Sequence, residues 1–229
     1  MYFLVAIDAK LIAQSGSKSM DEVRMIAAAQ KGDVPSFNQL VRAYQGLVYH
    51  TAFRVLGEGE AAADATQDAF VSAYKNIRSF RGGSFKSWLL RIVTNSCYDQ
   101  LRAKQRKPTA SLDALLVDPD NPAPGLGEAH EESPHEFAER QELSSMIQKG
   151  LQTLPAEQRV TLVLSDIDGF ANEEIAQITG TNVGTVNSRL SRARAHLREF
   201  LLAQEELLPS PYRLKGEAAD ASHLSFENV

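Results

Sequence analysis

Apolar residues recur three and four positions apart through most of this chain, and this spacing predicts helices rather than strands. The first block of such residues spans 21–106. Four helices are expected within it. The first covers 21–31, and the second begins after Asp33 and ends at Gly57. The third covers about 60–78, and the fourth begins after Ser84. Four helices with short connections predict a compact bundle. We expect the third helix to turn its apolar stripe into that bundle: Ala65, Phe70, Val71, Tyr74 and Ile77.

A second helical block, 134–202, follows a segment of different composition. Residues 107–133 are rich in proline, glycine and acidic residues and lack helical periodicity, which favours a flexible linker. The second block predicts helices near 134–152, 156–167, 172–179 and 183–202. The predicted fold class is therefore all-α, with two small helical domains joined by a flexible acidic linker. We expect residues 1–20 to be a disordered arm and residues 203–229 to be a disordered tail.

The pair of helices at 172–179 and 183–202 is the most informative segment. We expect Asn172 to cap the first helix, Gly180 to end it and Asn182 to cap the second. The second helix has one apolar stripe, formed by Val183, Val186, Leu190, Ala193 and Leu197. Its other face is polar and basic, which is the layout of a helix-turn-helix that enters the DNA major groove. The candidates for DNA contact are Asn182, Thr185, Asn187, Ser188, Arg189, Arg192 and Arg194.

An ordinary helical hairpin with a solvated basic face has the same pattern, so the distribution of charge matters. The whole chain has a formal net charge of −5. Residues 21–106 nevertheless hold 12 Lys and Arg against 8 Asp and Glu, whereas residues 107–142 hold 2 against 9. Local charge, not net charge, sets the affinity for phosphate. The sequence therefore favours nucleic-acid binding in spite of its overall acidity.

The sequence argues against several other classes of protein. Cys97 is the only cysteine, and it lies on the apolar side of a predicted helix, which favours a buried structural thiol. We find no histidine and cysteine cluster that suggests a metal site, no motif that implies a cofactor, and no nucleophile or paired-carboxylate motif of an enzyme. The apolar start of the chain is short and lacks a basic flank, so we expect neither a signal peptide nor a membrane span.

Two long motif blocks give the chain a family resemblance. The first is AAQKGDVPSFNQLVRAYQGLVYHTAFRVLG followed by ADATQDAFVSAYKNIRSFRGGSFKSWLLRIVTNSCYDQLR, and the second is LQTLPAEQRVTLVLSDIDGFANEEIAQITGTNVGTVNSRLSRARAHLR. In this order they resemble regions 2 and 4 of the extracytoplasmic-function (ECF, group 4) RNA polymerase sigma factors of the sigma-70 superfamily. The resemblance implies region 2 within 21–106 and region 4 within 134–202. It also implies a cytoplasmic protein that binds core RNA polymerase and directs transcription initiation from specific promoters.

The resemblance assigns two surfaces to region 2. The third predicted helix would dock on the clamp coiled coil of the largest polymerase subunit through Asp64, Gln67, Asp68 and Ser72, although a merely solvated polar face is the alternative. The loop 80–87 would capture a base flipped from the non-template strand of the −10 element, and the next helix would contact neighbouring bases and phosphates. Trp88 suits the core as well as a stacking surface. The implied −10 residues are Phe80, Arg81, Lys86, Ser87, Trp88, Arg91, Asn95, Asp99 and Arg102.

For region 4 the resemblance places the second helix of the helix-turn-helix in the major groove of the −35 element. Arg189 and Arg192 would contact guanine or phosphate there, and Asn187 would pair with adenine. The family often has lysine at the position of Asn187, which puts one contact in doubt. Region 4 would also bind the flap of the second-largest polymerase subunit. The acidic linker would thread into the channel of the nascent RNA, although a bland spacer would have a similar composition.

An anti-sigma factor that clamps both modules is the remaining implied partner. The resemblance predicts a lone chain that binds promoter DNA, double-stranded and melted, poorly until core polymerase holds its two modules apart. A sigma-like decoy that only occupies an anti-sigma factor is an alternative, but it would not need the arginine-rich helix. A plain helix-turn-helix repressor is another, but it would leave residues 21–106 unexplained and would bind palindromic sites as a dimer.

Overall fold

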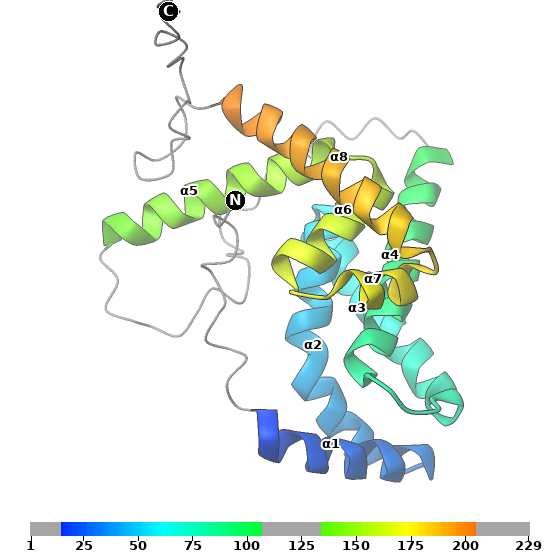
Figure 1. Ribbon diagram of the computed structural model, residues 1–229. Coiled ribbons are helices and arrows are strands. Elements are labelled where there is room, and N and C mark those ends of the chain that lie inside the picture. Colours follow the sequence, from blue (N-terminus) through cyan, green and yellow to red (C-terminus); the bar gives the residue numbers. More distant parts are fainter. Residues whose placement is uncertain (1–14, 107–133, 205–229) are drawn as a thin grey trace, which may run out of the picture.

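The computed structural model describes residues 15–106 and 134–204, and within these ranges it contains helices and no strands (Figure 1). The elements are α1 (Ser15–Gln30), α2 (Val34–Leu56), α3 (Gly59–Asn76), the short 3-10 helix η2 (Ile77–Ser79), α4 (Phe85–Arg106), α5 (Pro134–Thr153), α6 (Ala156–Leu162), the π-helical segment η4 (Val163–Ile167), α7 (Asn172–Thr179) and α8 (Val183–Leu202). The predicted all-α class is confirmed. The predicted linker, most of the predicted arm and almost all of the predicted tail lie outside the described residues.

Both ends of α2 are determined by local chemistry. Asp33 Oδ2 accepts a hydrogen bond from the backbone N–H of Ser36 at 2.9 Å, so Asp33 caps the helix as predicted. The helix ends at Gly57, whose φ of +81° lies in the left-handed region that favours glycine. A Cβ atom at Gly57 would lie only 2.6 Å from the side chain of Gln152 in the second module. The C-terminal end of α2 therefore lies very close to the second module.

Helix α3 packs into the first module through a seam of small residues. Ala62, Ala65, Ala69 and Ala73 are fully buried. The predicted inward stripe is right for Ala65 and for Ile77 of η2, but it is wrong for Val71 and Tyr74, which are 46% and 45% exposed. The four alanines occupy the middle of the buried side of α3, and Val71 and Tyr74 lie outside that side. Periodicity alone cannot choose between two apolar stripes that lie next to each other on one helix.

The second module contains the predicted helix-turn-helix. Helix α6 continues directly into η4, so residues 156–167 form one helical run whose last part has π geometry. Helices α7 and α8 follow, and Gly180 ends α7 with a φ of +66°. The buried stripe of α8 is as predicted, since Val186, Leu190, Ala193 and Leu197 are buried and Val183 is half-buried.

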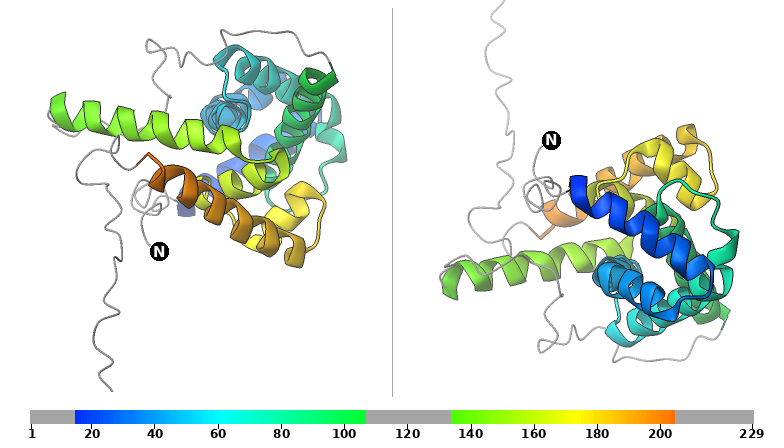
Figure 2. Two further views of the ribbon diagram at one scale, coloured as in Figure 1. Left: turned by 90° about the horizontal axis from the view of Figure 1, so that it is seen from above. Right: turned by 90° about the horizontal axis from the view of Figure 1, so that it is seen from below.

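The two modules pack against each other. Helices α5, α6 and α7 contact α2 or α4, and the buried apolar residues form one continuous cluster across the boundary (Figures 1 and 2). Polar side chains also join the modules, and we call them the polar clasp. The polar clasp consists of Thr51 and Arg54 from the first module and Ser144, Gln148, Gln152, Arg159 and Asp168 from the second.

The polar clasp covers the C-terminal end of α2, where the last carbonyl groups of a helix lack partners within the helix. Gln148 Nε2 donates to Phe53 O at 3.2 Å and to Arg54 O at 3.4 Å, and Gln152 Nε2 donates to Arg54 O at 3.2 Å. Arg159 Nη1 donates to Val55 O at 2.6 Å. Side chains of the second module thus cap a helix of the first.

Two further features strengthen the polar clasp. Thr51 Oγ1 lies 2.8 Å from Asp168 Oδ2 and donates a hydrogen bond to it. Arg159 is only 7% exposed, and burial lowers the pKa of its guanidinium below the ordinary value. Its Nη2 atom donates to Gln152 O and to Leu154 O at 3.0 Å each, so Arg159 also caps the end of α5.

Candidate nucleic-acid interface

Helix α8 presents its predicted polar face to solvent. Asn182 Oδ1 accepts a hydrogen bond from the backbone N–H of Thr185 at 2.7 Å and caps the helix as predicted. The side chain of Asn182 is therefore engaged at the helix start. Further along, Asn187, Ser188, Arg192 and Arg194 are exposed, and Thr185 and Arg189 are partly exposed. The candidate −35 residues are thus all at least partly exposed along the N-terminal part of α8 and at its cap.

Helix α7 begins differently from the prediction, because Asn172 does not cap it. Ala171 occupies the cap position and its N–H donates to Glu174 Oε2 at 3.1 Å, while Asn172 is already in the helix. Glu174 accepts from the N–H of the cap residue, a bond that places the start of the helix one residue earlier than predicted. Asn172 Nδ2 instead donates to Asn187 Oδ1 at 2.7 Å, which joins α7 to α8. This bond uses an acceptor site of the residue predicted to pair with adenine.

The arginines of α8 differ in their surroundings. Arg194 forms a two-point ion pair with Asp166 of η4, with Nη2 to Oδ1 at 2.6 Å and Nε to Oδ2 at 3.0 Å. This hydrogen bonding raises the pKa of Arg194. Arg189 lies near Tyr98 of α4: burial raises the pKa of Tyr98 to about 12, and the positive charge of Arg189 opposes that rise. The DNA-reading helix therefore lies close to the first module.

Helix α4 carries the predicted polar stripe. Arg91, Asn95, Asp99 and Arg102 are all exposed and lie at spacings of four, four and three residues. Arg102 Nη1 is 3.5 Å from Asp99 Oδ1, a weak ion pair between exposed groups. The stripe offers cations and hydrogen-bonding groups along one side of a helix, an arrangement suited to a nucleic-acid strand.

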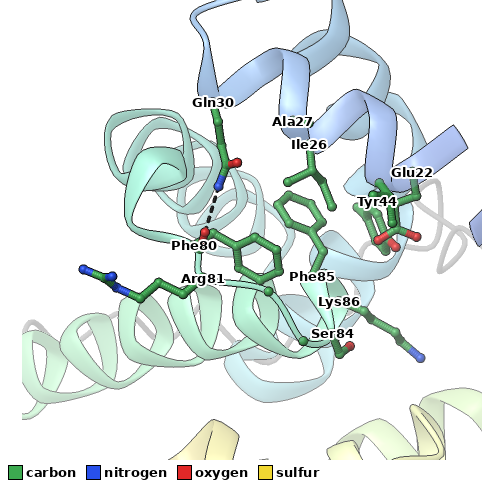
Figure 3. Close-up of a pocket in the computed structure, with 13 residues that line it drawn as sticks. Glu22, Ile26, Ala27, Gln30, Tyr44, Phe80, Arg81, Ser84, Phe85 and Lys86 are labelled. Atoms are coloured by element: carbon green, nitrogen blue, oxygen red, sulfur yellow. Dashed lines mark hydrogen bonds between the residues drawn. The ribbon is translucent and has the colours of Figure 1, made fainter. Parts of the chain in front are cut away.

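A cleft of about 600 Å³ lies between α1, α2, the loop 80–84 and the start of α4 (Figure 3). Phe80 and Phe85 line it, with ring centroids 5.6 Å apart in an edge-to-face arrangement. The loop turns at Gly82 and Gly83, which have φ values of +97° and +87° that favour glycine. Sequence reasoning found this loop from its aromatic and basic residues. It missed the wall that α1 contributes, which includes Glu22 and Gln30.

The other candidate −10 residues near this cleft have several different environments. Arg81 is exposed and lines the cleft, whereas Trp88 does not line it and packs half-buried against Phe80 at 5.4 Å and Phe85 at 5.5 Å. The core interpretation of Trp88 is therefore the one its packing supports. Ser87 is half-buried, and its N–H donates to Ser84 Oγ at 3.1 Å, which is the predicted cap of α4.

Lys86 lies at the boundary between the modules. Its ammonium group is 4.3 Å from the centroid of the Phe170 ring and 3.5 Å from Asp168 O. Both of these partners belong to the second module. Lys86, which was predicted to bind DNA, is thus in contact with the second module in this structure.

The polar face predicted on α3 is present. Asp64, Gln67 and Asp68 are exposed and Ser72 is half-exposed, and the exposed side chains of Val71 and Tyr74 extend this surface. A mixture of acids and accessible apolar groups is suited to a protein partner.

The described residues hold no group of three or more His, Cys, Asp and Glu side chains placed to bind a metal ion. Cys97 is buried as predicted, and burial raises the pKa of its thiol to about 12. Among the helices in residues 15–106 and 134–204, none is both long and apolar enough to span a membrane.

These features define a DNA-binding protein with two helical modules, one of which is a helix-turn-helix. Comparison with known sequences agrees: residues 40–107 match the sigma-70 region 2 family and residues 144–197 match the sigma-70 region 4 family. The chain belongs to the ECF RNA polymerase sigma factors of the sigma-70 family, and it acts in promoter-directed initiation of transcription.

Individual relatives extend this finding. The ECF RNA polymerase sigma-E factor of Escherichia coli K12 is 35% identical over 179 residues, which cover 78% of this chain and 93% of that protein. The ECF sigma factor SigE of Mycolicibacterium smegmatis is 34% identical over 175 residues, which cover 76% of this chain and 65% of that protein.

Two solved structures are similar to this one. CnrH, in complex with the cytosolic domain of CnrY, is 28% identical with a TM-score of 0.57, and the match covers 80% of this chain and 97% of CnrH. The sigma factor RpoE of Bartonella quintana, in complex with the anti-sigma factor NepR, is 28% identical with a TM-score of 0.55, covering 73% of this chain and 98% of RpoE.

Proposed function

We propose that this chain binds core RNA polymerase and starts transcription at a specific set of promoters, whose −35 element is read by region 4 and whose −10 element is opened and read by region 2. We assign region 2 to residues 21–106, the linker to 107–133 and region 4 to 134–202. The observation that carries the proposal is the combination, in one chain, of the exposed basic face of α8 with an aromatic cleft beside the polar stripe of α4.

At the −35 element, α8 enters the major groove with its N-terminal half. Arg189 and Arg192 contact guanine or the phosphate backbone, because a guanidinium can donate two parallel hydrogen bonds to either. Asn187 contacts a base edge while Asn172 fixes its side chain from α7 at 2.7 Å. Arg194 is paired with Asp166, so it contributes to the orientation of α8 as well as to the positive field.

At the −10 element, the cleft beside the loop 80–84 takes a base flipped from the non-template strand. Phe80 and Phe85 provide an apolar surface for that base, and Arg81 lies where it can meet the backbone. The stripe of α4 then follows the strand through Arg91, Asn95 and Arg102. Capture of a flipped base couples the melting of the duplex to sequence selection. Unstacking a base costs a few kcal/mol, and only the contacts of a base that fits the cleft offset this cost.

Docking on the polymerase uses other surfaces. The exposed face of α3, with Asp64, Gln67, Asp68 and Ser72, binds the clamp coiled coil of the largest subunit, and region 4 binds the flap of the second-largest subunit. The chain performs no chemistry itself and works in the cytoplasm, where the polymerase is.

The packed arrangement of the two modules cannot serve a whole promoter. The −35 and −10 elements lie about 25 base pairs apart, which is about 85 Å at 3.4 Å per base pair. Helix α7 packs on both α4 and α8, so the two DNA-reading helices contact the same short helix. The modules must therefore separate before both elements are bound, and core polymerase supplies two docking sites that hold them apart.

An anti-sigma factor is the second partner that we infer. The two similar solved structures are sigma factors bound to the cytosolic domain of CnrY and to NepR, respectively. A partner of this kind would act on the present chain by stabilising an arrangement in which the DNA-binding surfaces cannot reach a promoter together.

Mapping of transcript start sites tests the proposal. Purified core polymerase transcribes the genomic DNA of the source organism with and without the chain, and new 5′ ends are sequenced. New start sites that share two upstream elements are expected. If a folded chain that binds core polymerase yields no new start sites, the proposal is wrong, and the decoy alternative is then tested by pull-down of an anti-sigma factor.

A further inference from the structure

We propose that α1 takes part in reading the −10 element, with Glu22 as a specificity-determining acceptor for a flipped base that carries an exocyclic amine. This inference rests on the proposed function of the cleft and adds the identity of the base class and the residue that selects it. Helix α1 ends at Gln30, before residue 40, where the match to region 2 begins.

The first supporting observation is the way in which Gln30 joins α1 to the loop. Gln30 Nε2 donates to Phe80 O at 2.7 Å and to Ile77 O at 3.2 Å (Figure 3). Both acceptors lie on the segment that leads into the loop, and both amide protons of Gln30 are used. Since a carbonyl group can only accept, the nitrogen must face these two groups and the Oε1 atom must face away from them. Helix α1 is therefore joined to the loop segment at one side of the cleft, and Gln30 itself lines the cleft.

The second observation is the position of Glu22, about two turns before Gln30 on the same helix. Glu22 and Tyr44 both line the cleft and lie side by side in Figure 3. Burial of Tyr44, and after it the nearby negative charge of Glu22, raise the pKa of Tyr44. The ring of Tyr44 also packs against Phe85, with centroids 5.5 Å apart. A carboxylate can accept about four hydrogen bonds, so Glu22 retains acceptor sites for a ligand.

Groups of both charges line the cleft. Glu22 and Gln30 line it from α1, Phe80 and Phe85 contribute aromatic rings, and Arg81 and Lys86 line it from the loop and the first turn of α4. A carboxylate repels phosphate and attracts N–H groups, so the nucleotide enters with its base toward α1 and its backbone toward the cations. Adenine, cytosine and guanine offer an exocyclic amine to Glu22, whereas thymine offers carbonyl oxygens at the corresponding positions.

Removal of single amine groups from DNA tests this inference. Holoenzyme assembled from the full chain binds single-stranded oligonucleotides with the non-template −10 sequence, once start-site mapping has defined that sequence. Each adenine, cytosine and guanine is replaced in turn by purine, 2-pyrimidinone or hypoxanthine, which lack the exocyclic amine. At one position we expect the loss of the amine to weaken binding about tenfold, the effect of removing a hydrogen bond to a charged group.

Variants of α1 then identify the partner of that amine. In Glu22→Met, which has similar length but no acceptor, loss of the same amine is expected to change binding less than about twofold. Asp21→Asn is the matched control, because it removes one negative charge from the exposed neighbour of Glu22, which does not line the cleft, and it should retain the tenfold effect. Each comparison is made within one protein, so a general change in DNA affinity or stability cancels.

The inference is overturned if every amine deletion has the same effect in wild type and in Glu22→Met, or if no deletion matters in wild type. Failure of the proposed function is a different result: the holoenzyme would then start transcription at no promoter. Promoter-directed transcription without the Glu22-dependent amine effect would refute only the role of α1.

Discussion

The substitution Gln148→Leu tests whether the polar clasp keeps the two modules together. Gln148 is only 4% exposed, and its side chain reaches across the boundary in three hydrogen bonds. Its Oε1 atom accepts from Arg54 Nη1 at 3.2 Å, and its Nε2 atom donates to Phe53 O at 3.2 Å and Arg54 O at 3.4 Å. Leucine has a similar volume, so the substitution removes these bonds and leaves the packing largely filled.

The expected loss of free energy depends on whether the partners of Gln148 keep other hydrogen bonds after the substitution. Phe53 O still accepts from Gly57 N at 2.8 Å, and Arg54 O still accepts from Gln152 Nε2 at 3.2 Å, so neither carbonyl is left without a partner. The loss is then the net value of the bonds: about 1 kcal/mol for each neutral one and about 1.5 kcal/mol for the one from Arg54. Because the distances are long, we expect about 3 kcal/mol in total, which shifts the ratio of closed to open molecules about 150-fold.

Fluorescence energy transfer between the modules measures this shift. Dyes are attached at Asn38→Cys on α2 and Ala195→Cys on α8, two exposed positions. The native Cys97 is buried and its pKa is raised to about 12, so it remains a protonated thiol and does not compete for the dyes at neutral pH. Gln141→Leu, at an exposed position of the same helix, is the matched control.

We expect Gln148→Leu, but not Gln141→Leu, to increase the population with low transfer and to separate thermal unfolding into two transitions. Circular dichroism establishes that the helix content is retained. If the transfer distribution of Gln148→Leu equals that of the control while the helices are intact, these hydrogen bonds do not hold the modules together and the reasoning is refuted.

Three further predictions concern separate surfaces. Arg189→Ala combined with Arg192→Ala should abolish transcription from the cognate promoter and leave core-polymerase binding intact; loss of core binding in a pull-down would show that these arginines have another role. Asp64→Arg combined with Asp68→Arg should abolish core binding while the protein remains folded, and an unchanged affinity would contradict docking through α3. Asn182→Ala removes the 2.7 Å cap of α8 and should lower the free energy of unfolding by about 1 kcal/mol in denaturant titration, whereas an unchanged midpoint would mean that the cap is unimportant.

Features that depend on neighbouring residues could be predicted from the sequence. Asp33, Ser84 and Asn182 each cap a helix as expected, because the acceptor and the N–H that it binds are three residues apart. The same reasoning was wrong for Asn172, where Glu174 offers a competing acceptor to Ala171. It was also wrong for Val71 and Tyr74, since the alanine seam of α3 defines a neighbouring buried face.

Contacts between distant residues could not be predicted from periodicity. The sequence indicated that α2 and α5 have apolar faces, but nothing in it paired Gln148 with Phe53, 95 residues earlier, or Arg159 with Val55, 104 residues earlier. The contribution of α1 to the cleft could not be predicted for the same reason, because it depends on a hydrogen bond between Gln30 and Phe80, which are 50 residues apart. An amphipathic pattern identifies which side of a helix is buried, and it leaves open which helix covers it.

Lys86 connects the packed arrangement of the modules with the reading of DNA. Its ammonium group lies 4.3 Å from the Phe170 ring centroid and 3.5 Å from Asp168 O, and Lys86 also lines the cleft that is proposed to receive the DNA strand. An ammonium held by region 4 is not available to a phosphate of the −10 strand, so region 4 and the strand compete for it. By thermodynamic linkage, separation of the modules then favours DNA binding, and bound DNA favours the separated state by the same factor. A cation–π contact contributes only about 0.5–2 kcal/mol, less than the roughly 3 kcal/mol expected for Gln148 alone. Lys86 therefore adjusts the balance between the two states, and the polar clasp, which caps the end of α2, contributes more than Lys86 to the free energy that core polymerase must overcome.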